Sequence, residues 1–278
     1  MLFRILENIL VDYQIAMLGV LCAWIVTFWA LSKKFKFLPY DQGRAFAING
    51  EVSKGKIRRV GIIIAVSYVI ISCLFVKITT EYIIFCILFL AVMISGYLDD
   101  AAETPWSDYK KGFIDLIISI VYMLSFVSYN STDIFLFSNV IHVPTSLYVV
   151  LGIILIWVSI NVTNCSDGVD GLCATLSLVT IFSFVILFSN EMDEYSMYSL
   201  ILIGCILAYL YFNTSPSSML MGDAGSRSIG FFIAIIAMKS GHPFAYLLLA
   251  LVMIVDGGLG LMKIFLLRFM KIHILSNI

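Results

Sequence analysis

The feature that most constrains this chain is a series of long apolar segments separated by short polar ones. A helix needs about 20 apolar residues to cross the hydrocarbon core of a bilayer. A spanning helix also satisfies its own backbone polar groups, which lipid cannot do. We identify nine candidate spanning segments, at about 14–31, 60–77, 82–98, 113–128, 146–161, 173–190, 197–212, 229–239 and 244–267.

The composition supports the same conclusion. The chain is 61% hydrophobic and 13% charged, with a mean hydropathy of +1.03, whereas about a quarter of the residues of a soluble domain are charged. We therefore predict an all-α, polytopic integral membrane protein with residues 1–278 as a single transmembrane domain. The exception is the segment 130–143, where we expect an extended, partly apolar hairpin at the membrane interface. The lipid bilayer is the expected surrounding, and no nucleic-acid partner is expected.

The basic residues predict the orientation of the chain. If the N-terminus lies outside, only three of the 17 basic residues lie on the outer side, namely Arg4, Lys77 and Lys239. The cytoplasmic side then holds Lys33, Lys34, Lys36, Arg44, Lys54, Lys56, Arg58, Arg59, Lys110, Lys111, Arg227, Lys263, Arg268 and Lys271. Cytoplasmic loops of membrane proteins carry an excess of Lys and Arg, so we predict that the N-terminus is outside.

Three acidic, glycine-bearing motifs interrupt the apolar pattern. They are the segments 96–103 (GYLDDAAE), 161–172 (NVTNCSDGVDGL) and 221–226 (MGDAGS). Ionisable residues near a membrane are costly and are candidates for function. The predicted orientation places all three motifs on the cytoplasmic face, together with the long basic loop 32–59, so we expect them to form one polar site.

Such a site suits phosphate chemistry. Mg²⁺ binds through one or two carboxylates together with substrate phosphates, and basic side chains neutralise phosphoryl oxygens. Taken singly, each motif has a simpler explanation. Asp99 and Asp100 could end a helix in water, Asp167 and Asp170 could belong to tight turns, and Asp223 could cap a helix. Because the predicted orientation places all three motifs on the cytoplasmic face, we favour one shared function over three separate structural ones.

The three motifs, in this order and spacing, resemble those of the polyprenyl-phosphate N-acetylhexosamine-1-phosphate transferases of glycosyltransferase family 4. The resemblance covers nearly the whole chain. Within that family, the segments 43–50 and 53–56 look most like a phospho-N-acetylmuramoyl-pentapeptide transferase. The resemblance implies a ten-helix fold in the bacterial cytoplasmic membrane, with the active site on the cytoplasmic face.

The resemblance also implies a reaction and a set of residues. The reaction is the Mg²⁺-dependent transfer of phospho-N-acetylmuramoyl-pentapeptide from UDP to undecaprenyl phosphate, giving lipid I and UMP for peptidoglycan synthesis. Asp99 and Asp100 are expected to activate the lipid phosphate and, with Asp223, to form the metal site. The residues expected to bind the UDP-sugar are Lys56, which would approach the phosphates, and Asn164, Asp167, Asp170 and Asn213.

This chain departs from the family pattern in two places. Leu220 stands where the family has an aromatic residue, and the sequence stops at Ile278, before the family's histidine-rich loop and tenth helix. We therefore expect this chain to be truncated at its C-terminus. Three alternatives stay open: an N-acetylglucosamine-1-phosphate transferase that starts surface-glycan synthesis, an ion-coupled transporter, and a non-catalytic relative that binds polyprenyl phosphate. The oligomeric state also stays open, with a homodimer as one candidate.

Overall fold

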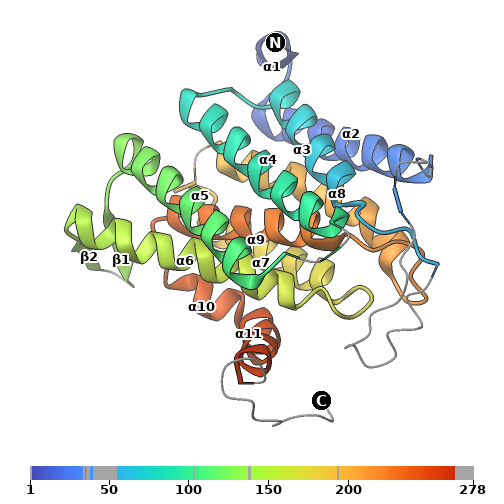
Figure 1. The fold of residues 1–278 in the computed structure, drawn as a ribbon. Coiled ribbons are helices and arrows are strands. Elements are labelled where there is room, and N and C mark those ends of the chain that lie inside the picture. Colours follow the sequence, from blue (N-terminus) through green and yellow to red (C-terminus); the bar gives the residue numbers. More distant parts are fainter. Residues whose placement is uncertain are drawn as a thin grey trace.

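The computed structural model describes residues 2–33, 35, 38–39, 55–102, 104, 106–136, 139–192 and 194–266. These residues form a bundle of helices with one short hairpin (Figure 1). The elements are α1 (Leu2–Leu6), α2 (Asp12–Ser32), α3 (Gly61–Phe75), α4 (Thr80–Ala101), α5 (Asp108–Tyr129), β1 (Asp133–Leu136), β2 (Asn139–His142), α6 (Thr145–Cys165), α7 (Leu172–Phe188), α8 (Tyr195–Asn213), α9 (Gly222–Lys239), α10 (Ala245–Leu249) and α11 (Leu251–Phe265).

The helices are those of a multi-pass membrane protein. Within the described residues, α2, α4, α5, α6 and α8 are long and apolar enough to cross a membrane, and α3 and α7 are shorter apolar helices. Large apolar side chains such as Trp29, Ile87 and Leu248 lie exposed on the outside of the bundle. Apolar surface of this extent is typical of a face that contacts lipid.

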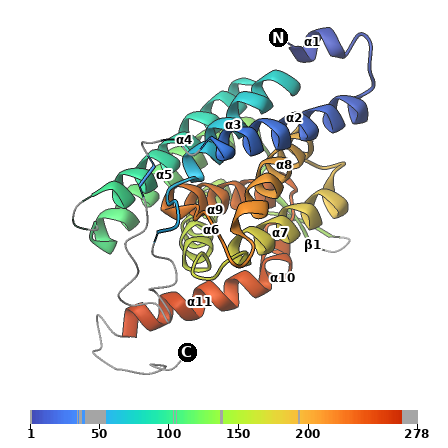
Figure 2. The ribbon, with the colours of Figure 1, turned by 90° about the vertical axis from the view of Figure 1, so that its right-hand side faces the viewer.

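Helix α9 lies in the middle of the bundle (Figure 2) and packs against α3, α4, α6, α7 and α8. From Gly222 to Met238, every residue of this helix except Asp223 is buried. The packing is close because small residues face each other. A Cβ atom on Gly96 of α4 would lie 2.5 Å from the carbonyl of Asp223. Such small-residue contacts let membrane helices approach each other, and here they bring the ends of α4 and α9 together.

Two of the predicted segments differ from the observed helices. The segment predicted at 229–239 is part of a longer helix, α9, which begins at Gly222 and so includes most of the third polar motif. The segment predicted at 244–267 is divided at Ala250, whose backbone (φ −100°, ψ 14°) leaves the helical conformation. The two resulting helices run in different directions, and α11 extends along one side of the bundle (Figure 2).

The predicted hairpin is confirmed. Strands β1 and β2 pair antiparallel, with Asp133 opposite His142, and the Asp133 carboxylate contacts His142 Nδ1 at 2.7 Å. These two short strands are the exception to an all-α fold among the described residues.

A buried polar cluster lies at the end of α4 and α9 opposite to the acidic motifs. Lys239 Nζ lies 3.0 Å from Glu81 Oε2 and donates to Asn130 Oδ1 at 2.7 Å. It also lies 4.6 Å from the centre of the Tyr195 ring. The cluster joins the ends of α4, α5 and α9. It also gives the Lys239 ammonium partners, without which burying its charge would be costly.

Candidate active site

The C-terminal end of α4 meets the N-terminal end of α9 through Asp100. Asp100 Oδ2 accepts a hydrogen bond from the main-chain N–H of Asp223 at 2.8 Å, and Oδ1 accepts one from Arg58 Nη2 at 2.7 Å. Gly222 has a φ of +70°, and a Cβ atom there would lie 2.4 Å from Asp100 Oδ2. Asp100 thus satisfies one of the N–H groups left free at the start of a helix, and only glycine leaves room for it.

Asp99 and Asp223 share one cation, Lys111. Asp99 Oδ1 accepts a hydrogen bond from the main-chain N–H of Trp106 at 2.8 Å, while its Oδ2 contacts Lys111 Nζ. Lys111 Nζ lies 3.5 Å from Asp223 Oδ2. Asn164 Nδ2, at the end of α6, lies 3.5 Å from the same oxygen. The structure therefore brings one predicted residue from each motif to a single point.

A second cluster surrounds Asp170, in the loop between α6 and α7. Lys56 Nζ lies 2.9 Å from Asp170 Oδ2 and donates to Ser217 Oγ at 2.7 Å, and the Ser217 N–H donates to Asp170 at 3.1 Å. Burial acts to raise the pKa of the Asp170 carboxyl. Hydrogen bonds from Ser217 and Lys56, with the Lys56 charge, outweigh burial and hold that pKa below its ordinary value.

Two extended segments connect the clusters. Ile57 N–H donates to the Ser218 carbonyl at 3.2 Å, and Leu220 N–H donates to the Ile57 carbonyl at 2.8 Å. Further along, Gly61 N–H donates to the Met221 carbonyl at 3.0 Å. The segment 56–61 therefore runs alongside 217–221, and it carries basic side chains to both clusters.

The two remaining predicted residues lie beside the second cluster. Asn213 is buried, accepts a hydrogen bond from the Gly171 N–H at 3.0 Å and donates to the Met219 carbonyl at 2.9 Å. Both side-chain groups of Asn213 thus bind main chain and fix the two loops. Asp167 is partly exposed in the turn that follows α6.

The acidic end suits a hard divalent cation. Asp99 and Asp223 offer carboxylate oxygens, the donors that Mg²⁺ prefers when phosphates complete its shell, although in this structure those oxygens contact the Lys111 ammonium. Within the described part of the chain, no group of three or more His, Cys, Asp or Glu side chains could hold a metal ion by itself. These residues therefore fit Mg²⁺ as a partner of a bound phosphate.

Sequence reasoning missed several residues of the site, above all Lys111. It follows a second lysine, Lys110, which lies over the Trp106 ring at 3.4 Å and is exposed. Two adjacent lysines at a helix start give no signal for which one turns inward. The predicted residues Lys34, Lys36, Arg44, Lys54, Glu103, Arg268 and Lys271 and the segment 43–50 lie outside the described residues.

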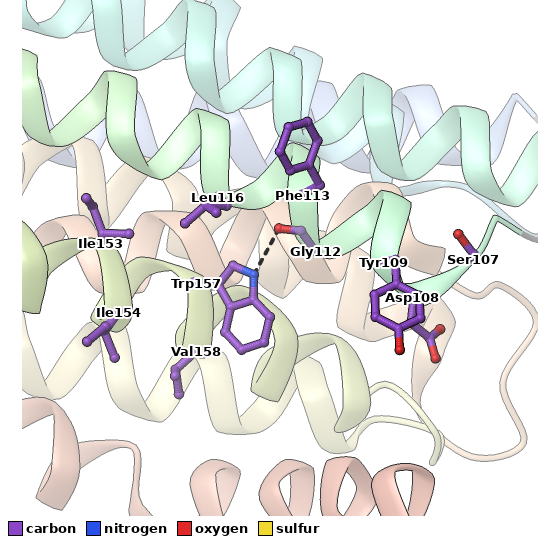
Figure 3. A pocket seen from close by; sticks show the side chains of 10 residues that line it. All are labelled: Ser107, Asp108, Tyr109, Gly112, Phe113, Leu116, Ile153, Ile154, Trp157 and Val158. Atoms are coloured by element: carbon purple, nitrogen blue, oxygen red, sulfur yellow. Dashed lines mark hydrogen bonds between the residues drawn. The ribbon is translucent and has the colours of Figure 1, made fainter. Parts of the chain in front are cut away.

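An apolar groove lies between α5 and α6, close to the acidic end (Figure 3). Its volume is about 940 Å³. Ser107 and Asp108 lie at one end of the groove and Ile153 and Ile154 at the other, and Trp157 Nε1 donates to the Gly112 carbonyl at 3.0 Å. Because Lys111 follows Asp108 by three residues, the polar end of the groove adjoins the site.

Comparison with known proteins shows the family of the chain. Residues 82–241 match the family model described as glycosyl transferase family 4. The chain is similar to the phospho-N-acetylmuramoyl-pentapeptide-transferase of Treponema pallidum (strain Nichols), at 34% identity over 99% of this chain and 81% of that protein. Proteins of the same name match at 28% identity in Wolbachia sp. subsp. Drosophila simulans (strain wRi), over 70% of this chain and 64% of theirs, and at 29% in Listeria monocytogenes serovar 1/2a (strain ATCC BAA-679 / EGD-e), over 61% and 55%.

Proposed function

The chain belongs to glycosyl transferase family 4, and from that premise we propose that it is a phospho-N-acetylmuramoyl-pentapeptide transferase. Its substrates would be a UDP-linked sugar and undecaprenyl phosphate, and its products lipid I and UMP. The observation that carries the proposal is that Asp99 and Asp223, from two different helices, both contact Lys111, while Asn164 from a third helix contacts Asp223. An ion-coupled transporter would not need this family's motifs at one end of the bundle.

The reaction is a displacement at phosphorus. An oxygen of the lipid phosphate forms a new bond to the sugar-linked phosphorus, and the bond from that phosphorus to the UMP oxygen breaks. Lys111 is placed to neutralise charge on the phosphoryl oxygens, where a preorganised cation is effective. Asp99 holds that lysine and is the candidate to accept the proton of the lipid phosphate.

Mg²⁺, if bound here, would supply further positive charge to stabilise the charge on the phosphoryl oxygens. Asp223 and Asp99 would hold it through carboxylate oxygens that do not face Lys111, since both side chains lie beside that lysine. Asp100 differs from them. Its two oxygens accept from Arg58 and from the main chain of Asp223, so its part is to hold α9 and Arg58 in place.

The lipid substrate would occupy the apolar groove between α5 and α6. Its polar end at Ser107 and Asp108 adjoins Lys111, and its apolar end at Ile153 and Ile154 faces away from the site (Figure 3). A polyprenyl phosphate is likewise polar at one end and apolar along its chain, and its phosphate would bind the Lys111 cation rather than the Asp108 carboxylate. Lys56, Asp170 and Asp167 would bind the UDP-sugar on the other side of the site.

The proposal includes the topology. The N-terminus would lie outside and the acidic motifs on the cytoplasmic side of a bacterial inner membrane, since most basic residues then face the cytoplasm. The helices α2 to α9 would each cross once, and α10 with α11 would form the ninth span.

The test is Mg²⁺-dependent UMP release from UDP-N-acetylmuramoyl-pentapeptide and undecaprenyl phosphate in detergent. We expect release that is lost with EDTA and in Asp223→Ala. UMP release from UDP-N-acetylglucosamine alone would assign the chain instead to the transferases that start surface-glycan synthesis. Binding of undecaprenyl phosphate without release from either sugar would identify a non-catalytic relative.

A further inference from the structure

A second ion pair joins α5 and α9 one helical turn away from Lys111 and Asp223. Arg227 Nη2 lies 2.6 Å from Asp115 Oδ1, and the two side chains are 2% and 1% exposed. Arg227 Nη1 and Asp115 Oδ2 have no hydrogen-bond partner among the described residues. Removing both charges from water is costly, and replacing such a pair by apolar residues is often neutral or stabilising. Stability alone is therefore a weak reason for this pair.

The two ion pairs alternate in sign along the two helices. Lys111 and Asp115 are four residues apart on α5, and Asp223 and Arg227 are four residues apart on α9. Residues four apart on a helix are neighbours on the same face. On α5, Asp115 therefore has the oppositely charged Lys111 of the site as a neighbour. On α9, Arg227 has the oppositely charged Asp223 as a neighbour.

We propose that Arg227 and Asp115 are positioning residues that keep each other from binding the charges of the site. While Arg227 is held by Asp115, it does not compete with Lys111 for Asp223. While Asp115 is held by Arg227, it does not compete with Asp99 and Asp223 for Lys111. This role rests on the proposed transferase function and adds two residues to it.

The single variants Arg227→Met and Asp115→Asn each release one competitor. The first leaves Asp115 free to bind Lys111, and the second leaves Arg227 free to bind Asp223. We expect each to lower kcat by about 10- to 100-fold, the usual cost of losing an outer partner of a catalytic ligand. The double variant Asp115→Asn/Arg227→Met removes both competitors, and we expect its kcat to exceed that of either single variant.

The exchange Asp115→Arg/Arg227→Asp separates this role from that of a simple cross-link. The exchanged side chains can form an ion pair again, but each then lies one turn from a like charge, either Lys111 or Asp223. We expect kcat to stay low. Recovery of kcat by the exchange would overturn the proposal. If the exchanged protein does not fold, the neutral double variant decides, because a kcat at or below that of the weaker single variant also overturns it.

A matched control lies at the other end of the same helix. Lys239→Met/Glu81→Gln removes a buried ion pair of α4 and α9 that is remote from the site, and we expect it to change the unfolding temperature and to leave kcat unchanged. A second readout is the rise in unfolding temperature on adding Mg²⁺ together with UMP, whose phosphate would complete the metal site, and this rise should be lost in the two single variants and kept in the neutral double variant. An equal rise in all of them would overturn the proposal. Absence of UMP release by the unmodified chain would count against the proposed function, and the unfolding readout with Mg²⁺ and UMP would still test the positioning role.

Discussion

The main-chain N–H of Asp223 donates a hydrogen bond to the side chain of Asp100, at 2.8 Å. This bond joins the second aspartate of the motif at 96–103 to the single aspartate of the motif at 221–226. It also distinguishes Asp100 from its neighbour Asp99, which contacts Lys111 instead. The contacts of these adjacent residues therefore differ, and we propose that Asp100 acts in the structure of the site and Asp99 in its chemistry.

The first prediction compares these two aspartates. Asp99→Asn should abolish UMP release and change the unfolding temperature little, because the Trp106 N–H can still donate to the remaining carbonyl oxygen and Lys111 still has Asp223 beside it. Asp100→Ala should lose activity and also about 1–2 kcal/mol of stability, the usual cost of removing a helix cap. Thermal unfolding in detergent with Mg²⁺ absent measures the difference. Equal unfolding temperatures for the two variants would contradict the assignment.

The second prediction concerns Gly222. At a φ of +70° an alanine is strained, and its Cβ would lie 2.4 Å from Asp100 Oδ2. Gly222→Ala should therefore destabilise the protein by about 1–3 kcal/mol. The control is Gly258→Ala on α11, where a Cβ meets no atom within 4 Å. That variant should be as stable as the original or slightly more so, because alanine favours a helix.

The third prediction compares the two lysines at the start of α5. Lys111→Met removes the cation between Asp99 and Asp223, and UMP release should fall by about 100-fold or more, as when one preorganised donor is lost from an active site. Lys110→Met removes only an exposed contact with the Trp106 ring and should change the rate by a few-fold at most. If the two variants lost UMP release to a similar extent, Lys111 would have no special part in the reaction.

Much of this arrangement could be predicted from the sequence, because apolar length and acidic motifs are local signals. The spans, the hairpin and the approach of Asp99 to Asp223 follow from such signals. The break at Ala250 does not, since alanine favours a helix and the apolar pattern continues through it. The inward turn of Lys111 and the pairing of Arg227 with Asp115 depend on how helices distant in the sequence pack, so no local pattern reports them.

The fourth prediction concerns pH. The pKa of Asp170 lies below its ordinary value because Ser217 and Lys56 bind the carboxylate more than burial disfavours it. The carboxylate therefore stabilises the folded state above the unfolded pKa, near pH 4, and this contribution is lost as the pH falls through the folded pKa. The difference in unfolding temperature between the original chain and Asp170→Asn should be largest near neutral pH and should shrink in acid. If the difference in unfolding temperature does not change with pH, the ion pair between Lys56 and Asp170 is not its source.

The last prediction tests the groove between α5 and α6 as the site of the lipid chain. Leu116 lines the groove and is partly exposed, so Leu116→Trp should fill part of its volume. We expect the KM for undecaprenyl phosphate to rise by about tenfold, equivalent to about 1.4 kcal/mol, with the KM for the UDP-sugar unchanged. Leu124→Trp, two turns further along α5 and outside the groove lining, is the control. If both variants raised the lipid KM equally, the effect would come from the lipid-facing surface of α5 in general. If Leu116→Trp raised the KM for the UDP-sugar instead, the groove would belong to the other substrate.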